Sequence, residues 1–563
     1  MSKNFLLTVM LLMAAVSSYA NNIYRVTAYS LEEEGDGLSW QSPMSLVNAL
    51  SVAQTDDIIY LKAGTYIIDN SITISKAITL KGGFLGTDDE TMAEKPLTIF
   101  DTDRKTTFNN VLNITTTSSG ATNKIINIGL KNGYARGLYK KGAADLLVEG
   151  CLIMTNGLAN AATGKGAYVA SATGATITFR NTEFRANRQE SGTAGSPQPA
   201  LSLTECKEAI VDGCSFFGNS LLIIAPKTGE TSGNPLGDKF TNGSAIYTTV
   251  KTTVVGCRFS GNCANIRSDA NTSGTIWFAS GSSGSVVSNS LFYGNYDRSS
   301  WNYNGKSSGA IVQSMGALTH TLEVVGSTFA YNLSDVTASA AGICVLKGTL
   351  NLRDCVFGGN MVNPNTTYKS NDLVVNDNGV ANVSYTVFGQ DEANTYYKTV
   401  YGNINFGEGV VFADPQFVTR PDYLKDILTD DSKTGRRIFK NGLSTYDVLE
   451  GIDAHLLSST GYRTVKDSSF VASSVHSPAI DASSPASQVG DEPSPNASRR
   501  NAGFYGGTAE ASMSSIAPVT IAEEDVTAQF DESTYVTLSI LVRGETPCNA
   551  TVKIETFSTD PTL

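Results

Sequence analysis

The chain reads CSFFGN at residues 214–219, and this small-x-apolar-x-x-Asn pattern returns as CRFSGN at 257–262, SLFYGN at 290–295 and CVFGGN at 355–360. Three further copies, CLIMTN, TEFRAN and STFAYN, complete a set of seven. We place an earlier, divergent copy at Asn132 and a degenerate one at Gln390. Successive copies lie between 24 and 43 residues apart, and a period of this size is typical of stacked structural repeats.

Repeats of this kind bury their apolar side chains only by stacking on one another. Short runs of β-branched and aromatic residues, such as TTVVGCRF, alternate here with Gly, Asn and Ser, and no segment shows sustained helical periodicity. The sequence therefore predicts an all-β protein, a right-handed parallel β-helix of about nine to twelve coils. We expect a helical cap at its N-terminus and a small β-rich tail at its C-terminus.

The pattern assigns a role to each of its conspicuous residues. The Phe of each copy is expected to fill the interior, and the Asn three positions later to turn a corner in the left-handed backbone conformation. Stacked asparagines would then form a ladder of hydrogen bonds. A pair of small residues ahead of most copies, as in Gly309-Ala310, predicts close approach between successive coils.

Half of the eight cysteines follow the same repeat. Four of them, Cys151, Cys214, Cys257 and Cys355, occupy the first position of the pattern, where other copies carry Ser or Thr. We expect a column of buried thiols there, because free cysteine behaves as a small apolar residue. Disulfides, for example between Cys257 and Cys263, are the alternative in an exported protein.

The first twenty residues have the layout of a signal peptide, with Lys3, an apolar run from Phe5 to Val16, and small residues before Ala20. That run is too short to span a membrane, and no later stretch is long enough. We therefore expect an exported protein, extracellular or at the cell surface. The net charge of −12 disfavours nucleic acid as a partner, and three histidines are too few for a multi-histidine metal site.

The small-residue and Phe-x-x-Asn elements between Ile126 and Gln390 resemble the polymorphic outer-membrane protein repeats of bacterial autotransporter adhesins, within the pectin-lyase-like superfamily. The stretch from Asp57 to Tyr66 is similar to the opening of secreted bacterial β-helix proteins. SPAIDASS and RRNAGFYGGT, near the other end, resemble the closing coil of the same proteins, whose tails anchor them to surfaces in various ways. These resemblances imply association with the outer membrane.

These features predict five segments. They are a signal peptide at 1–20, a cap with the first coils at 21–125, the repeat region at 126–400, closing coils with a polar insertion at 401–508, and a linker with a partial β-sandwich-like tail at 509–563. In the cap, Ser42 is expected to begin a helix, and Gly82-Gly83 to form a tight turn. The tail is either a truncated domain, which we favour, or a segment that packs on the solenoid.

The sequence offers little for catalysis. The adjacent carboxylates available for glycoside hydrolysis are Asp56-Asp57, Asp88-Asp89 and Asp430-Asp431, and none falls on the stacked strands. The clustered Arg180, Arg185 and Arg188 suit elimination chemistry, but alternation places them on a solvated face. We therefore assign no catalytic residue and no metal. Calcium is the one cofactor considered, and its candidate oxygen donors are Asp453, Asp481 and Asp491.

A binding role fits better. Long insertions follow the Asn corner at 188–199, 225–242, 296–308 and 362–372, so they are expected to project from one side of the solenoid. The third insertion carries residues suited to stacking on sugar rings or to a protein contact, namely Tyr296, Asp297, Arg298, Trp301 and Tyr303. A self-packed loop is the alternative, and Trp277 is expected in the core.

These expectations describe a monomeric, non-enzymatic, adhesin-like protein that binds a glycan or a host surface protein through the loops of one side. The alternative is a polysaccharide lyase or glycoside hydrolase of the pectin-lyase-like superfamily.

Overall fold

The computed structural model of the protein describes most of the chain, with gaps. The described residues are 21–28, 34–89, 91–92, 98–105, 110–157, 164–187, 199–219, 244–264, 274–297, 308–334, 340–362, 372–390, 396–398, 402–419, 428–430, 437–439, 452–515, 526–530 and 536–540.

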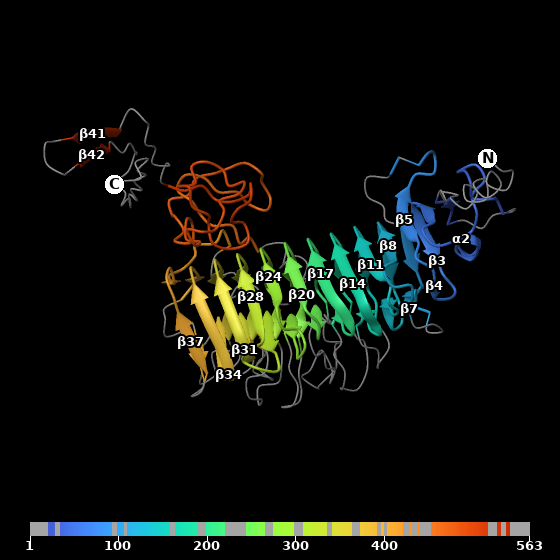
Figure 1. Ribbon diagram of the computed structural model, residues 1–563, viewed down its shortest axis with the longest axis horizontal. Helices are drawn as coiled ribbons and strands as arrows, with labels where there is room; N and C mark the ends of the chain where they lie inside the picture. The colour runs from blue at the N-terminus through green and yellow to red at the C-terminus, as the bar shows by residue number, and fades with distance from the viewer. Residues whose placement is uncertain are drawn as a thin grey trace, which may run out of the picture.

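The protein is a right-handed parallel β-helix, as the sequence predicted (Figure 1). A coil has three sides, which are illustrated by β19 (Ile246–Thr248), β20 (Thr252–Val255) and β21 (Arg258–Ser260). Each strand pairs in parallel with its counterparts in the coils before and after it. We call these sides 1, 2 and 3. Among the described residues side 3 has twelve strands, which matches the upper end of the predicted range of coils.

Sides 1 and 2 form one continuous sheet of 22 strands, bent within each coil. Side 1 contains, besides β19, the strands β4 (Ile72–Ile74), β7 (Asn110–Ile114), β10 (Arg136–Lys140), β13 (Ala167–Val169), β16 (Leu201–Leu203), β23 (Ile276–Phe278), β27 (Ile311–Ser314) and β36 (Tyr396–Lys398). Side 2 contains, besides β20, the strands β1 (Ile23–Val26), β2 (Ile58–Lys62), β5 (Thr79–Phe84), β8 (Thr122–Ile126), β11 (Asp145–Glu149), β14 (Ala172–Arg180), β17 (Cys206–Asp212), β24 (Ser285–Ser288), β28 (Thr321–Val325) and β37 (Asn403–Phe406). Two long strands, β31 (Ile343–Arg353) and β34 (Leu373–Ser384), run through both sides.

The remaining strands complete each coil or lie outside the main sheets. Side 3 contains, besides β21, the strands β3 (Gly64–Ile67), β6 (Thr98–Asp101), β9 (Ile128–Lys131), β12 (Leu152–Met154), β15 (Glu183–Arg185), β18 (Ser215–Phe217), β25 (Leu291–Tyr293), β29 (Thr328–Ala330), β32 (Val356–Gly358), β35 (Val387–Phe388) and β38 (Val411–Phe412). A four-stranded sheet follows the Asn corner, with β22 (Cys263–Ala264), β26 (Tyr296–Asp297), β30 (Leu333–Ser334) and β33 (Met361–Val362). Two antiparallel hairpins pair β39 (Leu428–Asp430) with β40 (Arg437–Phe439) and β41 (Val526–Phe530) with β42 (Val536–Ile540).

A short helix, α2 (Leu46–Val52), packs beside β1 and buries Leu46 and Ala49. Its N-cap is Ser45, whose hydroxyl accepts a hydrogen bond from the backbone of Asn48. The predicted cap, Ser42, instead closes a turn through its carbonyl, so the helix begins later than expected. The predicted turn at Gly82-Gly83 was also wrong, because both glycines lie within β5, where the register shifts at a bulge.

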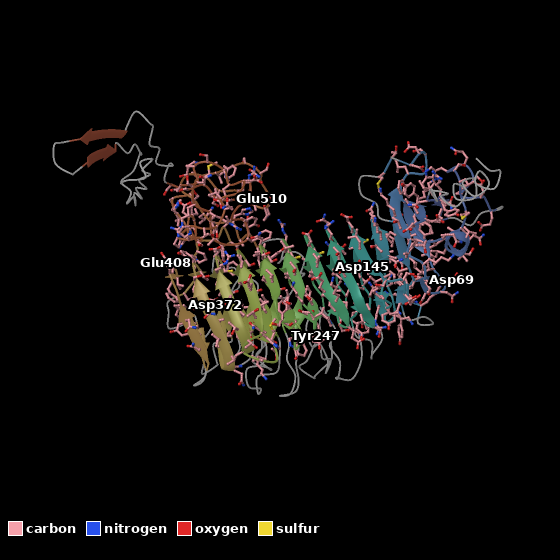
Figure 2. All side chains as sticks on the ribbon, in the orientation of Figure 1. Asp69, Asp145, Tyr247, Asp372, Glu408 and Glu510 are labelled. Atoms are coloured by element: carbon pink, nitrogen blue, oxygen red, sulfur yellow. The ribbon has the colours of Figure 1, made fainter. Side chains whose placement is uncertain are left out.

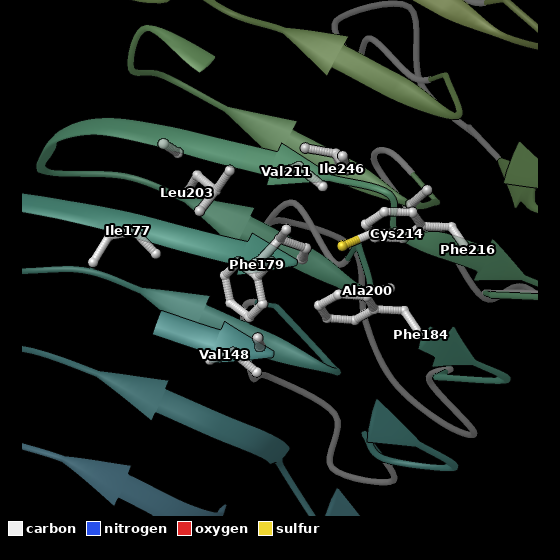
Figure 3. Close-up of a cluster of buried hydrophobic side chains, with 14 of the residues drawn as sticks. Val148, Ile177, Phe179, Phe184, Ala200, Leu203, Val211, Cys214, Phe216 and Ile246 are labelled. Carbon is white, nitrogen blue, oxygen red and sulfur yellow. The ribbon is translucent and has the colours of Figure 1, made fainter. Parts of the chain in front are cut away.

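The interior is built on a column of stacked phenylalanine rings, as predicted. Phe184 stacks on Phe216 with their ring centroids 4.7 Å apart (Figure 3). The stack continues through five more coils to Phe388, at 4.5 to 5.0 Å per step. These rings up to Phe357 are fully buried. Each stacked pair adds about 0.5–1.5 kcal/mol to the free energy of burial, so identical rings in register reinforce one another.

A ladder of buried asparagines runs beside this column, from Asn156 to Asn360. The Nδ2 of each asparagine donates to the Oδ1 of the asparagine in the next coil, at 2.9 to 3.1 Å. The same Oδ1 accepts the backbone N–H of the preceding asparagine, at 3.0 to 3.2 Å. The other N–H of each Nδ2 donates to the backbone carbonyl at the Phe position of the preceding coil, as Asn262 does to Phe216. The predicted ladder is therefore confirmed.

The predicted backbone conformation of these asparagines was wrong. The residue with positive φ is the one before the asparagine, as at Gly218, Gly261 and Tyr331. This residue makes the corner, and the asparagine, one position later, holds neighbouring coils together. Asn132 is at the corner position with φ 63°, and Gly133 takes the place of a ladder asparagine, since its N–H bonds to Asn156 Oδ1. The divergent copy was thus placed one residue out of register.

The cysteine column is confirmed. Cys151, Cys214, Cys257 and Cys355 are buried free thiols, and so is Cys263, the expected alternative partner of Cys257. In this column a side-chain hydroxyl or thiol accepts the backbone N–H of the preceding coil, for example from Cys257 to Ser290 Oγ at 3.3 Å. Burial raises the pKa of the Cys151 and Cys355 thiols to about 12, so these thiols are poor nucleophiles.

Residues 413–419 and 452–515, which we call the closing module, form a turn-rich body on side 3 near the end of the solenoid (Figure 1). Phe417 and Tyr505 pack with Tyr331 and Val356 of the solenoid. Within its described residues the closing module has isolated β-bridges, such as Phe417 with Leu456, in place of the coils that the sequence suggested.

We predict that Asn262→Ala strongly destabilises the protein. Its carboxamide makes four buried hydrogen bonds, with Asn219, Phe216 and Asn295, and leaving these groups unpaired costs about 1–3 kcal/mol each. The urea midpoint should fall by the equivalent of at least about 3 kcal/mol. The control is Asn378→Ala, an exposed position on β34. Equal midpoints for the two variants would contradict the role of the ladder.

The ladder ends on a carboxyl group. Asn360 Nδ2 donates to Asp372 Oδ1 at 2.9 Å, whereas Asp372 Oδ2 is buried without a hydrogen-bond partner. Figure 2 labels the position of Asp372. Burial raises the pKa of Asp372 from 3.8 to about 7. Between these values the folded protein keeps a proton that the unfolded chain releases, so Asp372 destabilises the fold increasingly as the pH rises from about 4 to 7.

Asp372→Asn should therefore be more stable than the wild type above pH 7 and nearly equal to it at pH 4. Urea unfolding across this pH range is the measurement, with Asp491→Asn, an exposed carboxyl group, as the control. A constant difference at all pH values would contradict a titrating Asp372.

Candidate functional site

A shallow groove of about 360 Å³ lies on the outer face of side 2, near the C-terminal end of the solenoid. Four consecutive strands line it, namely β28, β31, β34 and β37. Strand alternation decides which side chains it presents. On β31, Leu350 and Leu352 point into the core, and Asn351 and Arg353 point outward. The same alternation holds on β34, where Asn382 is exposed between buried Ala381 and Val383.

One polar residue from each of the four strands shares the same register position. Glu323 pairs with Asn351, Asn351 with Asn382, and Asn382 with Asn405. The carboxamides are linked, because Asn405 Nδ2 donates to Asn382 Oδ1 at 2.8 Å and Asn382 Nδ2 donates to Asn351 Oδ1 at 2.9 Å. The groove thus has a second asparagine ladder, which faces solvent. We call Glu323, Asn351, Asn382 and Asn405 the outer row.

The positively charged residue of the groove, Arg353, is linked to the closing module through Asp354. Arg353 donates to Asp354 Oδ2 at 2.9 Å, and half of the Arg353 side chain is exposed. Asp354 is fully buried, with φ 57°, and its carboxylate accepts hydrogen bonds from the backbone of Ser484 and the hydroxyl of Ser487. The charge of Arg353 is therefore balanced by Asp354. Glu323 is exposed and is the carboxylate among the described lining residues.

The chemistry available in the groove follows from this inventory. Carboxamides donate and accept hydrogen bonds, which suits hydroxyl-rich ligands. Glycoside hydrolysis needs two facing carboxyl groups, and the described lining residues supply one, Glu323. The groove is equipped to hold a polar chain, and lacks among these residues the pair needed to cleave it.

The five predicted binding residues lie elsewhere. Tyr296 and Asp297 form β26, on the far side of the Asn corner. Tyr296 is half-buried and packs against the cluster of the closing module. Asp297 is fully buried, and its Oδ2 accepts the Ser334 hydroxyl at 3.1 Å, so it faces the four-stranded sheet. Arg298, Trp301 and Tyr303, and most of the predicted insertions, lie outside the described residues, and their binding role stays a prediction.

The adjacent carboxylates serve structural contacts. Asp57 is buried and accepts the backbone N–H groups of Asn22 and Gln54. Asp89 pairs with Arg25 and with the Trp40 indole, and the Asp89 pKa is lowered mainly by its hydrogen bond with Arg25. Asp430 lies in β39, but its side chain and Asp431 are outside the described residues.

The arginine cluster is spread over two sides. Arg180, on side 2, pairs with Asp212 at 3.1 Å. Arg185, on side 3, pairs with Glu183 and lies over the Phe217 ring. Both side chains are more than 40% exposed, as the alternation predicted, and Arg188 lies outside the described residues.

Side 1 presents an outward row of aromatic rings that the sequence reading missed. Tyr139 stacks on Tyr168, and Arg136 lies over both rings at 5.3 and 5.0 Å. Trp277, expected in the core, points outward, half-buried, against Tyr247. Lys165 is fully buried nearby, and this burial, with the Arg136 charge, lowers its pKa to about 7. The alternation of inward and outward side chains along the side 1 strands, in GAY at 166–168 and TIW at 275–277, could have revealed this row.

Two of the three candidate calcium ligands, Asp453 and Asp481, are engaged with protein groups, and Asp491 is exposed. Asp453 accepts from the His455 ring at 2.7 Å and from the backbone of Val465, and Asp481 accepts from the Ser514 hydroxyl. In the described ranges, no three His, Cys, Asp or Glu side chains gather closely enough to hold a metal ion. Calcium binding stays a prediction without a geometric site.

Comparisons with known proteins add little beyond these observations. No protein-family model matches the chain, and no curated protein matches it. Pectate lyase Pel9A is 15% identical, covering 86% of this chain and 95% of its own, with a TM-score of 0.38. The A-module of the mannuronan C-5 epimerase AlgE4 from Azotobacter vinelandii is 9% identical, covering 64% and 90%, with a TM-score of 0.35. The catalytic unit of a GH87 α-1,3-glucanase from Streptomyces thermodiastaticus is 12% identical, covering 69% of each chain, with a TM-score of 0.32.

These likenesses are weak, and the fold is defined by the strand pairing of the chain itself. The resemblance to adhesin repeats and to an anchoring module stays a prediction. In the described ranges, no helix has the length and apolar character needed to span a bilayer.

We predict that Asp354→Asn loosens the closing module. Removing the charge weakens the contacts to Ser484, Ser487 and Arg353, at a cost of about 1–3 kcal/mol. Hydrogen exchange of residues 484–487 should accelerate, and the urea midpoint should fall. The control is Asp212→Asn, which breaks an exposed ion pair with Arg180 worth at most about 1 kcal/mol. If hydrogen exchange of residues 484–487 is unchanged, the Asp354 carboxylate is not needed to hold the closing module on the solenoid.

Proposed function

We propose that the protein is an exported, non-enzymatic β-helix protein that binds a glycan in the groove on side 2. The observation that carries this proposal is the outer row, in which Asn351, Asn382 and Asn405 face solvent from consecutive coils. Sugar hydroxyls both donate and accept hydrogen bonds, as carboxamides do. A groove lined by such groups binds a glycan without needing charge on either partner.

The composition of the groove favours binding over bond cleavage. Its described carboxylate, Glu323, has no second carboxylate opposite to it among the lining residues, and its arginine is neutralised by Asp354. A hydrolase needs a second acid, and a lyase needs a free base and a group that neutralises the substrate carboxylate. Polysaccharide lyase or hydrolase activity is therefore the alternative that the experiment must exclude.

An adhesin-like role at the cell surface, as a monomer, completes the proposal. It is supported by the signal-peptide layout of residues 1–20 and by the repeat resemblance. A glycan on a neighbouring cell or in the surrounding matrix is the ligand that such a protein meets.

The test compares two bulky substitutions in the same row of side 2. Asn382→Trp fills the groove, and Thr253→Trp places the same ring four coils away. The purified chain and both variants are applied to an immobilised glycan array, and the bound glycans are then incubated with the wild type. We expect at least tenfold weaker binding, about 1.4 kcal/mol, for Asn382→Trp and an unchanged affinity for Thr253→Trp.

The outcomes separate the alternatives. Binding that Asn382→Trp does not weaken would place the glycan site elsewhere, and the absence of any bound glycan would refute the function. Shortened or unsaturated products would show an enzyme, and would overturn the non-enzymatic assignment.

A further inference from the structure

The outer row has hydrogen-bonding capacity left in a regular pattern. Within the ladder, Asn382 uses one N–H toward Asn351 and one oxygen lone pair toward Asn405. A carboxamide has two N–H donors and two acceptor lone pairs, so one donor and one acceptor of Asn382 remain for solvent or a ligand. Such a pair matches two neighbouring hydroxyls of a sugar, one accepting and one donating.

The pattern repeats at the coil spacing. Neighbouring strands of a sheet lie about 4.8 Å apart, and the row runs across the strands, along the solenoid axis. This spacing is close to the rise per sugar of an extended, β-linked pyranose chain. A chain lying along the axis would meet an equivalent group at each sugar, whereas a chain lying along one strand would meet Asn382, Ser384 and the corner in turn.

The charges in the groove act against acidic sugars. Arg353 is already paired with buried Asp354, which leaves the exposed Glu323 as the unbalanced charge among the described lining residues. A uronate carboxylate bound beside Glu323 would be repelled. A neutral chain meets no such penalty, and its hydroxyls can donate to Glu323.

The row has two ends. Toward the N-terminus, Glu323 is followed at the same register position by Val286, an apolar side chain. Toward the C-terminus, Asn405 lies on β37, the last strand of side 2 within the described residues. The polar row therefore covers four coils.

Building on the proposed function, we propose that the groove selects a neutral, extended polysaccharide lying along the solenoid axis, with one sugar facing each of the four coils of the outer row. The ligand class is a β-1,4-linked neutral glycan, and the length of the row sets the number of sugars that contribute to affinity.

The test is calorimetric titration of the full chain with oligosaccharides of increasing length. The neutral probes are cello-, manno- and xylo-oligosaccharides, and the acidic probes are oligogalacturonates and oligomannuronates. We expect one or more neutral series to bind, with an affinity that rises up to four sugars and then stays level. Acidic chains of equal length should bind at least tenfold more weakly, and Glu323→Gln should reduce that difference.

Two alanine variants on one strand report on the ladder. Asn382→Ala should weaken the binding of the four-sugar ligand about tenfold, and Asn378→Ala, four residues earlier on β34 and also exposed, should leave it unchanged. Preference for acidic chains, affinity that keeps rising beyond four sugars, or an Asn382→Ala variant that binds normally would overturn this inference. If Asn382→Trp still blocks binding in those cases, the proposed function stands; absence of binding to every glycan refutes both.

Discussion

Every coil of this protein must return to the same position one strand spacing further along the axis. Backbone hydrogen bonds on three sides set that spacing, and the corner after side 3 is the place where the chain has least regular structure to guide it. The asparagine ladder fixes the position of the chain at this corner, because each buried carboxamide, such as that of Asn262, joins three successive coils. The phenylalanine column then stacks at the same spacing, 4.5 to 5.0 Å, so the packing of the interior depends on the corner hydrogen bonds.

Much of this architecture could be predicted from the sequence, because the same residue types recur at the same positions in the seven copies of the repeat. Phe259 alone is compatible with many folds, but a Phe at the same place in six copies defines an interior column. The errors concern local backbone geometry, which the repeat pattern does not specify. Ser45 and Ser42 are both good N-caps, and only packing chooses between them. The corner conformation was assigned to asparagine, yet the glycine before it, as in Gly218-Asn219, was the residue carrying the signal.

The candidate site was harder to predict for a physical reason. Glu323, Asn351, Asn382 and Asn405 belong to strands that differ in length and are separated by 23 to 31 residues. Each looks like an ordinary exposed residue in its own strand, and only the register brings them together. The aromatic residues of the insertion after β26 drew the prediction instead, because Trp and Tyr are conspicuous in sequence. Aligning every strand of side 2 on the following corner residue would have revealed the row.

The distance along the chain between ladder asparagines varies from 28 to 43 residues, yet the step from one carboxamide to the next stays at 2.9 to 3.1 Å. The largest length difference falls between the corner and side 1, where 27 residues separate Asn219 from Ile246 but 14 separate Asn262 from Ile276. In such a scaffold the stacked coils stay constant while the segments between them vary in length and sequence. Segments can be lengthened, shortened or exchanged at that junction during evolution or by engineering, while neighbouring rungs keep their alignment.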